Sequence, residues 1–227
     1  MEFLKSGKTK DIYKLPDGNI LLIFKDTVTG HPSGEKDPGG NVVVGEVKGT
    51  GYNALKVTSY YFNLLKKLNI PTHFVSSDLS KNEMVVNFAT PFGKGLEFVV
   101  RYIATGSFVK RFGMYCKDGD VMNPPVYEVT LKDDAHDDPP VTADILDSLK
   151  LMSKEQFEFA RTQTLKICNL VKDDLAQKGL DLYDIKVEFG LVNGKIVLID
   201  EISAGNMRVY KDGKKLDYDT ASKLIVK

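Results

Sequence analysis

The sequence predicts an α+β fold, because patterns typical of antiparallel strands occur at both ends of the chain and two amphipathic helices are predicted between them. The first 25 residues form a strand-turn-strand pattern, and residues 183–202 form another. Residues 53–69 and 153–178 repeat apolar residues at helical spacing. At 227 residues the chain is long enough for one large domain or for two lobes.

The composition excludes several classes of function. Lys plus Arg and Asp plus Glu both number 31, so no bulk basic charge is present to hold nucleic acid. No apolar run approaches the roughly 20 residues that span a bilayer, and we expect no secretory signal. Cys116 and Cys168 are isolated and the three histidines are scattered, which argues against a zinc site. We expect a cytoplasmic protein with small-molecule partners, without nucleic acid or membrane, and compatible with a homodimer.

The N-terminal strands enclose a glycine turn that could bind phosphate. Strands are predicted at residues 3–5, 8–15 and 20–25. The motif SGKTK at 6–10 separates the first two and contains Lys8 and Lys10. Two lysines beside a glycine turn can act as point charges over phosphate groups. An ordinary turn is the alternative explanation.

A long loop, a helix and two strands are predicted next. Residues 26–51 are rich in glycine, and a loop of this length is usually functional or mobile. The helix at 53–69 ends before Pro71. Strands are predicted at 72–77 and 83–89.

An arginine lies inside a predicted buried strand, residues 96–103. A guanidinium such as that of Arg101 rarely occupies a buried strand without an anionic partner, which indicates an anion-binding position. A short helix is predicted to begin at Thr105-Gly106-Ser107. Ser107 is either its N-cap or a phosphate ligand at its N-terminus.

The second half of the chain contains an acidic loop and the longest predicted helix. The strand at 127–132 leads into KDDAHDDPP, whose four aspartates are either solvated or available to bind a cation or orient an amine. Ser153 and Gln156 form a capping box for a helix whose buried stripe includes Cys168. The chain is predicted to end in a polar tail, residues 216–227.

The late segment 183–208 contains two carboxylates, Glu188 and Asp200, on a predicted β-hairpin. If they share one face, they suggest a divalent-cation site. Whether they do depends on the length of the loop that joins the strands. A two-residue loop, Asn193-Gly194, would put Asp200 on the face opposite Glu188.

A three-residue loop that also includes Val192 would gather Lys186, Glu188 and Asp200 on one face. This register requires a left-handed residue at its last loop position, and Gly194 is there. We therefore predict the three-residue loop. The alternative explanation of the face is a solvated surface with an ordinary Lys/Asp pair.

Six sequence pieces together resemble the phosphoribosylaminoimidazole-succinocarboxamide synthase (SAICAR synthetase) family. Their order and spacing carry the resemblance over nearly the whole chain, and no single piece is decisive. The pieces are GKTKDIYK, NIPTHF, EFVVRYIATGSFVKRFG, LKDDAHDDP, DIKVEFG and KIVLIDEIS followed by an arginine. The resemblance implies a two-lobed α+β fold, with an antiparallel N-terminal sheet lobe like that of kinases and an ATP-grasp-like C-terminal lobe. Residues 1–90 would form the nucleotide-binding lobe, and 91–227 the substrate and metal-binding lobe.

The resemblance also implies a reaction. ATP and Mg²⁺ would activate the carboxylate of carboxyaminoimidazole ribonucleotide, and the amine of L-aspartate would then displace phosphate to form an amide, in de novo purine biosynthesis. A carboxylate is a poor acyl donor at neutral pH, and phosphorylating it provides a better leaving group. The charge of the transferring phosphoryl group requires cations around it.

By this resemblance each candidate residue has a role. Lys8 and Lys10 would lie over the ATP phosphates, Asp184 and Lys186 beside the nucleotide, and Glu188 and Asp200 would hold Mg²⁺ and so contribute to binding the nucleotide. Arg101, Ser107 and Arg208 would bind the ribose phosphate and carboxylate of the substrate. Lys132 and Asp138 would line the cleft and, with Lys186, form the catalytic group. Catalysis would come from positioning and electrostatics, without a covalent nucleophile.

The chain departs from the family pattern at three places. The family commonly has an SPD-type sequence where this chain has Ser203-Ala204-Gly205, so a carboxylate is missing at Gly205. The arginines that tend to follow the late Asp-x-Asp motif are absent after Asp219, and the segment 34–51 is longer and more divergent than usual. A small-molecule kinase and a non-catalytic nucleotide-binding module on the same fold are therefore the alternative functions.

Overall fold

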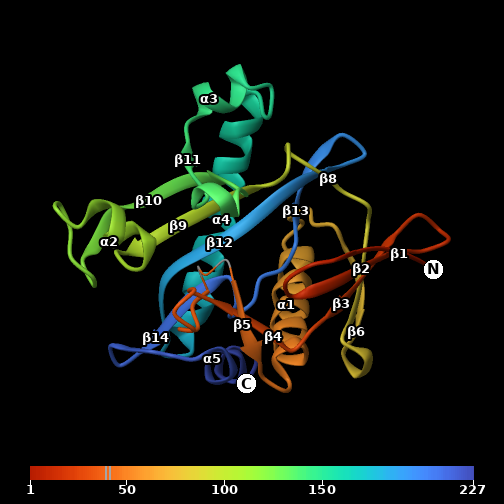
Figure 1. The fold of residues 1–227 in the computed structure, drawn as a ribbon, viewed down its shortest axis with the longest axis horizontal. Coiled ribbons are helices and arrows are strands. Elements are labelled where there is room, and N and C mark those ends of the chain that lie inside the picture. Colours follow the sequence, from red (N-terminus) through yellow and green to blue (C-terminus); the bar gives the residue numbers. More distant parts are fainter. Residues whose placement is uncertain (39, 41) are drawn as a thin grey trace.

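The computed structural model describes residues 1–38, 40 and 42–227. Two antiparallel sheets form its frame (Figure 1). The first has the order β1-β2-β3-β7-β6, with β1 Glu2–Ser6, β2 Lys10–Lys14, β3 Ile20–Phe24, β6 Phe74–Asp78 and β7 Glu83–Val86. A one-turn 3-10 helix, Leu79–Lys81, joins β6 to β7. All five strands come from residues 2–86, and the predicted division of the chain at residue 90 stays a prediction.

The second sheet has the order β11-β10-β9-β12-β14-β15, with β13 and β8 also paired to β12. Its strands are β8 Thr90–Pro91, β9 Leu96–Ile103, β10 Val121–Leu131, β11 Pro140–Val141, β12 Asp181–Val192, β13 Lys195–Ile199, β14 Met207–Lys211 and β15 Lys214–Lys215. The strand β12 lies at its centre, between β9 on one side and β14 on the other. The pairs β9–β10, β9–β12 and β12–β14 are all antiparallel.

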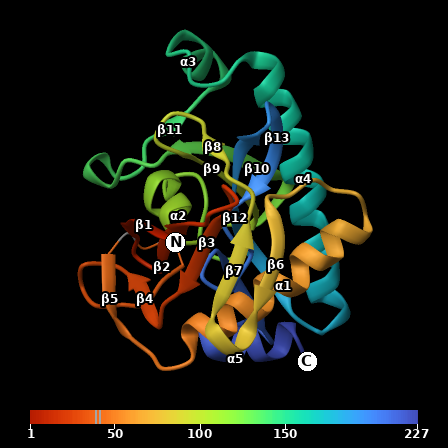
Figure 2. The same ribbon diagram turned by 90° about the vertical axis from the view of Figure 1, so that its right-hand side faces the viewer.

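Helices cover these sheets. They are α1 Thr50–Lys67, α2 Ser107–Phe112, α3 Ala143–Ser148, α4 Lys154–Gln177 and α5 Tyr218–Ile225, with a 3-10 turn at Asp134–His136. The long helix α4 packs on β9 and β12, whereas α1 and α5 lie side by side at the lower end of the molecule (Figure 2). One core joins both sheets to the helices, and it includes Leu22, Phe62, Phe98, Ile167 and Val187.

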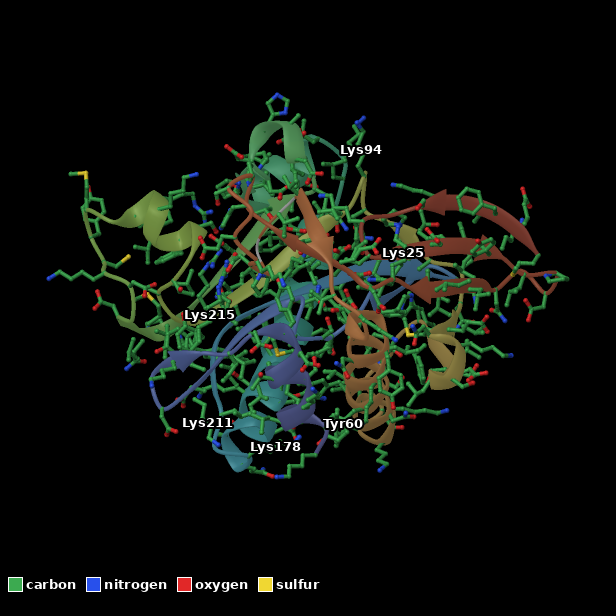
Figure 3. All side chains as sticks on the ribbon, turned by 60° about the horizontal axis from the view of Figure 1, so that its bottom comes forward. Lys25, Tyr60, Lys94, Lys178, Lys211 and Lys215 are labelled. Atoms are coloured by element: carbon green, nitrogen blue, oxygen red, sulfur yellow. The ribbon has the colours of Figure 1, made fainter. Side chains whose placement is uncertain are left out.

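A lysine at the end of α4 ties three helices together. Lys178 Nζ donates to Asp174 Oδ2 at 2.6 Å, to the hydroxyl of Tyr60 at 3.1 Å and to the carbonyl oxygen of Ile225 at 2.6 Å. Lys178 and Tyr60 lie together at the lower end of the molecule (Figure 3). A basic side chain near the last carbonyls of α5 also opposes the negative end of that helix dipole.

Two local predictions about α4 are confirmed, one by the hydrogen bonds that begin the helix and one by burial. The side chain of Ser153 accepts from the backbone N–H of Gln156, and Gln156 accepts from the backbone of Ser153, which completes the capping box. Cys168 is buried on α4, as its place on the apolar stripe predicts.

Three other expectations were wrong. The segment 26–51 contains a two-stranded ribbon, β4 Thr27–Gly30 and β5 Val42–Glu46, in place of an irregular loop; Gly39 and Asn41 lie outside the described residues. The tail is the helix α5, capped by Asp217, and it buries Ala221 and Ile225. Its polar appearance comes from an eight-residue helix that has only one buried face.

The predicted three-residue loop between β12 and β13 was also wrong. Val192 pairs directly with Lys195, and Glu188 pairs with Ile199, so the loop is the two-residue turn Asn193-Gly194. Asn193 has a φ of 50° and Gly194 a φ of 76°. Two consecutive positive φ values are what a tight hairpin turn requires, and Asn-Gly adopts them easily, so the shorter loop forms without strain.

Candidate active site

A cavity of about 480 Å³ lies between the two sheets. The five-stranded sheet contributes Lys8 and Lys10, from the glycine turn and the start of β2. The other wall contributes Lys132, Lys186, Glu188 and Asp200, from the end of β10, from β12 and from the end of β13. Cavities of several hundred Å³ are the usual size of small-molecule sites.

The backbone after β13 brings the two carboxylates together despite the corrected register. In a regular strand Asp200 would face away from Glu188, because Glu188 pairs with Ile199. However, β13 ends at Ile199, and Asp200 adopts a left-handed conformation with a φ of 62°. This turn of the chain lets Asp200 line the same cavity as Glu188. The two acids therefore share the cavity for a reason that the hairpin pattern did not predict.

Each carboxylate of the cavity contacts a lysine. Lys10 Nζ lies 3.0 Å from Asp200 Oδ1 and 3.0 Å from Glu201 Oε1. Lys132 Nζ lies 2.8 Å from Glu188 Oε1. Lys10, Glu188 and Glu201 are buried, so their charges interact more strongly than they would at the surface, whereas the side chain of Lys132 is exposed.

The pKa shifts follow from these contacts. Burial opposes the ionisation of Asp200, but the ammonium groups of Lys10 and Lys132 outweigh it and lower the pKa of this carboxyl. Burial and then the negative charge of Asp200 raise the pKa of Glu188. Burial would lower the pKa of Lys10, but Asp200 and Glu201 together raise it. The lysines are therefore charged at neutral pH, and Asp200 is an ionised carboxylate.

Glu188 and Asp200 suit a divalent cation. Mg²⁺ is usually held by one or two carboxylates together with substrate phosphates and water, so two acids are sufficient. Burial and, after it, the negative charge of Asp200 raise the pKa of Glu188, and a cation held by these carboxylates would offset the repulsion. Within the part of the chain that the structure describes, no group of three or more Asp, Glu, His or Cys side chains is arranged to hold a metal without such additional ligands.

Lys186 was predicted beside the nucleotide, and it lies on the same face of β12 as Glu188. Its Nζ is 2.6 Å from Glu97 Oε1 and 4.0 Å from Glu188 Oε1. Burial would lower the pKa of Lys186, but Glu97 raises it, so this lysine also remains charged. Glu97 stands directly opposite Glu188 on the neighbouring strand β9.

Two buried arginines form a second polar group beyond this cavity. Arg101 and Arg208 are 4% and 6% exposed, and both donate to Oδ2 of Asp184, at 2.8 Å and 2.6 Å. Arg208 Nε also donates to Asp37 Oδ1 at 3.1 Å. Arg101 further pairs with Glu128 on β10. Asp184, predicted beside the nucleotide, is thus held between the two predicted substrate-binding arginines.

Ser107 lies within reach of this arginine pair. Its Oγ accepts a hydrogen bond from Arg101 Nη2 at 3.2 Å. The N-cap of α2 is Gly106, which has no side chain to cap the helix, so the N-cap explanation of Ser107 was wrong. Ser107 is the first residue of the helix, and its hydroxyl faces the guanidinium. A Cβ on Gly106 would come within 2.6 Å of Arg208 Nη2, so glycine makes room for the second arginine.

The acidic loop contributes one residue to the cavity and one to its own conformation. Asp134 lines the cavity, and its Oδ2 lies 2.7 Å from Lys8 Nζ. Asp138 was predicted to line the cleft, but it is not one of the residues that line this cavity. Its Oδ1 accepts a hydrogen bond from the backbone N–H of Asp133 at 2.7 Å. Asp138 therefore shapes the loop that follows Lys132.

Four polar residues of the site were missed by the sequence reasoning. Glu97 is an acid in a mostly apolar strand, the same signal that indicated Arg101. Glu201 follows Asp200 directly and could have been found from that adjacency. Asp37 lies in the divergent glycine-rich segment, and no sequence signal distinguishes it from the acids around it. Lys215, whose Nζ lies 2.7 Å from Asp37 Oδ1, has no sequence signal that distinguishes it from the lysines around it (Figure 3).

The two sheets, with a cavity between them that is lined by lysines and carboxylates, define an α+β protein. The SAICAR synthetase family model matches residues 3–224. The phosphoribosylaminoimidazole-succinocarboxamide synthase of Clostridium tetani (strain Massachusetts / E88) is 48% identical over 228 residues, which cover 100% of both chains. That of Sulfurisphaera tokodaii is 35% identical over 215 residues, which cover 94% of this chain and 86% of that protein.

Solved structures agree. A SAICAR synthetase (Type-2) in complex with ADP superposes with a TM-score of 0.84 at 30% identity, covering 96% of this chain and 88% of that one. The phosphoribosylaminoimidazole-succinocarboxamide synthase from Ehrlichia chaffeensis gives a TM-score of 0.85 at 28% identity, covering 97% and 90%. The chain belongs to the SAICAR synthetase family. The predicted fold class and enzyme class are confirmed, and the kinase and non-catalytic alternatives are not favoured. None of the described helices is long and apolar enough to cross a membrane.

Proposed function

We propose that this chain joins carboxyaminoimidazole ribonucleotide to L-aspartate at the expense of ATP, giving SAICAR, ADP and phosphate. The observation that supports this most is the meeting of Lys10, Glu188 and Asp200 in one cavity, where cations face a paired acid site. A triphosphate with its metal ion has the complementary charges. Family membership and the relative that binds ADP support the same assignment.

In this proposal Lys8 and Lys10 hold the phosphates of ATP. Both line the cavity, and Lys25 Nζ donates to the carbonyl of Gly7 at 2.6 Å, which steadies the glycine turn that precedes them. Glu188 and Asp200 would hold Mg²⁺, which when bound neutralises phosphate charge and orients the transferring group. Nucleotide binding would belong to residues 1–90, and substrate and metal binding to residues 91–227.

Arg101, Ser107 and Arg208 would bind the anionic groups of the ribonucleotide. Two guanidinium groups that share one acid, Asp184, are held in fixed positions, and the planar fork of arginine suits phosphate and carboxylate. An incoming anion would compete with Asp184 and Asp37 for these donors. The acids keep the cluster neutral enough to remain buried until then.

The reaction requires two displacements. A carboxylate oxygen of the ribonucleotide attacks the γ-phosphorus, and the bond to the bridging oxygen of ADP breaks. The amine nitrogen of L-aspartate then attacks the acyl carbon, loses its proton, and the C–O bond to phosphate breaks. Lys132 and Lys186, both charged and facing Glu188, would stabilise the negative charge that develops on the transferred group, and Asp138 would fix the loop beside them.

A turnover assay with each substrate omitted in turn tests the proposal. We expect ADP release to require the ribonucleotide and Mg²⁺, and an amide product to require L-aspartate as well. ADP release at an undiminished rate without L-aspartate, with no amide formed in its presence, would instead indicate a small-molecule kinase. We also propose that the enzyme is cytoplasmic. We further propose that it forms a homodimer, and sedimentation of the purified protein would test its oligomeric state.

A further inference from the structure

A segment of the first half of the chain runs along the edge of β13, next to the candidate metal site. Thr72 forms a parallel bridge with Leu198. The N–H of His73 donates to the carbonyl of Leu198 at 2.9 Å, and the N–H of Leu198 donates to the carbonyl of Pro71 at 3.1 Å. These bonds fix His73 beside the point where β13 ends.

The side chain of His73 continues this contact one residue further. Its Nε2 lies 3.2 Å from the backbone carbonyl oxygen of Asp200. Because a carbonyl oxygen only accepts, Nε2 must carry the hydrogen. His73 is 5% exposed, and its ring packs edge-on against Phe62, with centroids 5.8 Å apart. The imidazole therefore has little freedom to turn away.

Asp200 needs such a contact. Its φ of 62° lies in the left-handed region, which is strained for a residue other than glycine. This conformation moves its carboxylate away from the face that the hairpin register dictates and into the cavity. A hydrogen bond to the carbonyl of the same residue resists a return to the extended conformation.

We propose that His73 is a positioning residue, whose imidazole holds the backbone of Asp200 in the conformation that turns its carboxylate toward Lys10 and Glu188. The inference rests on the proposed function, since it assigns Asp200 to the metal site. His73 lies in the connection between α1 and β6, far from the hairpin in sequence. The proposal therefore gives this distant residue an indirect role in catalysis.

Two substitutions separate the hydrogen bond from the packing of the ring. His73→Phe keeps an aromatic ring against Phe62 and removes the donor, whereas His73→Gln can place an amide N–H near the position of Nε2. We expect His73→Phe to lower kcat and raise the Mg²⁺ concentration for half-maximal activity, each by about tenfold, the size of one lost hydrogen bond. The KM for the ribonucleotide should stay unchanged. His73→Gln should restore most of the loss.

Phe74→Leu provides the control for packing alone. Phe74 packs edge-on against Phe62, with ring centroids 5.5 Å apart. Its substitution by leucine therefore perturbs the same aromatic group without touching the hydrogen bond of His73. It should lower Tm and leave both kcat and the Mg²⁺ requirement as they are. Normal kcat and Mg²⁺ requirement in His73→Phe, or equal impairment in His73→Gln, would overturn the positioning role. Wild-type protein without aspartate-dependent turnover would instead refute the proposed function.

A measurement on the unmodified protein does not depend on any variant folding. The sequence has three histidines, so the ring nitrogens of ¹⁵N-histidine-labelled protein can be resolved by NMR. We expect the imidazole of His73 to be the tautomer that is protonated at Nε2, and we expect this proton to exchange slowly with solvent. A ring protonated only at Nδ1 could not donate to Asp200 and would overturn the inference.

Discussion

Lys10 Nζ lies 3.0 Å from Asp200 Oδ1, and this ion pair connects the start of β2 in one sheet to the end of β13 in the other. A bound metal-nucleotide complex could replace each partner of this ion pair. A phosphate could replace the carboxylate beside Lys10, and a cation could replace the ammonium beside Asp200. The pair therefore keeps a charged site buried and folded while leaving it able to exchange both partners at once.

The first prediction concerns Asp200→Asn. The amide keeps the shape of the side chain but removes the charge, so we expect turnover to fall by at least about a hundredfold, within the several kcal/mol that metal-assisted charge stabilisation supplies. Stability should change by only about 1 kcal/mol, since Lys10 keeps Glu201 at 3.0 Å and Glu188 loses a repulsive neighbour. Steady-state turnover and denaturant unfolding measure the two effects.

Asp212→Asn is the matched control for that experiment. Asp212 is also an aspartate with a positive φ, 50°, but it lies exposed in the turn between β14 and β15. It should retain full turnover. If Asp200→Asn were as active as Asp212→Asn, Asp200 would not be a ligand of the proposed metal site.

The second prediction concerns two glycines that both have positive φ. A Cβ at Gly106 would come within 2.6 Å of Arg208 Nη2, whereas a Cβ at Gly119 would meet nothing within 4 Å. Gly119→Ala should therefore cost only the strain of the backbone, about 1–2 kcal/mol. Gly106→Ala should cost more, because its backbone (φ 57°, ψ −133°) is close to a region that is nearly restricted to glycine and because overpacking adds about 1–3 kcal/mol. It should also raise the KM for the ribonucleotide. An equal KM in the two variants would contradict an effect of Gly106→Ala on Arg208.

The sequence predicts the elements of this fold well because strand alternation, helix periodicity and capping residues are local signals. Ser153 and Gln156 show this: one capping box determines where α4 begins. The error in α5 comes from its length, because eight residues make only about two helical turns and so give a short pattern to recognise. Its burial depends on α1, which is distant in sequence.

The candidate site was harder to predict because its geometry depends on nonlocal contacts. Glu188 and Asp200 were predicted to share a face, and they share a cavity, but through the left-handed backbone of Asp200 and not through the loop register. Asp37 could not be found, because its partner Arg208 is 171 residues away along the chain. Pattern reasoning identified the chemical groups, whereas the tertiary structure determines which of them meet.

The third prediction concerns the pH dependence of stability at Asp37. Burial opposes ionisation of this carboxyl, but the Arg208 guanidinium outweighs it and lowers its pKa well below the ordinary value of 3.8. Below about pH 4 the unfolded chain takes up a proton that the folded protein refuses, so acid favours unfolding. The stabilisation is complete above about pH 5 and is lost as the pH falls toward the folded-state pKa.

Asp37→Asn lacks this titration. Its free energy of unfolding should be lower at neutral pH and should decline less between pH 5 and pH 2 than that of the wild type. Denaturant unfolding across this range gives the comparison. Parallel curves for the two proteins would mean that the pKa of Asp37 is not lowered by folding.

The last prediction concerns Arg208, which must be tested by a substitution that keeps its charge. Arg208→Ala would leave Asp37 and Asp184 buried with a partner removed, and breaking such a network costs about 3–5 kcal/mol, so a change of KM would be mixed with partial unfolding. Arg208→Lys keeps a cation near both acids but cannot donate in two directions from a planar fork. We expect a KM for the ribonucleotide about tenfold higher, with kcat and the KM for ATP little changed, since uniform binding of an anion is lost. A lowered kcat at unchanged KM would mean that Arg208 acts on the transition state and not on substrate binding.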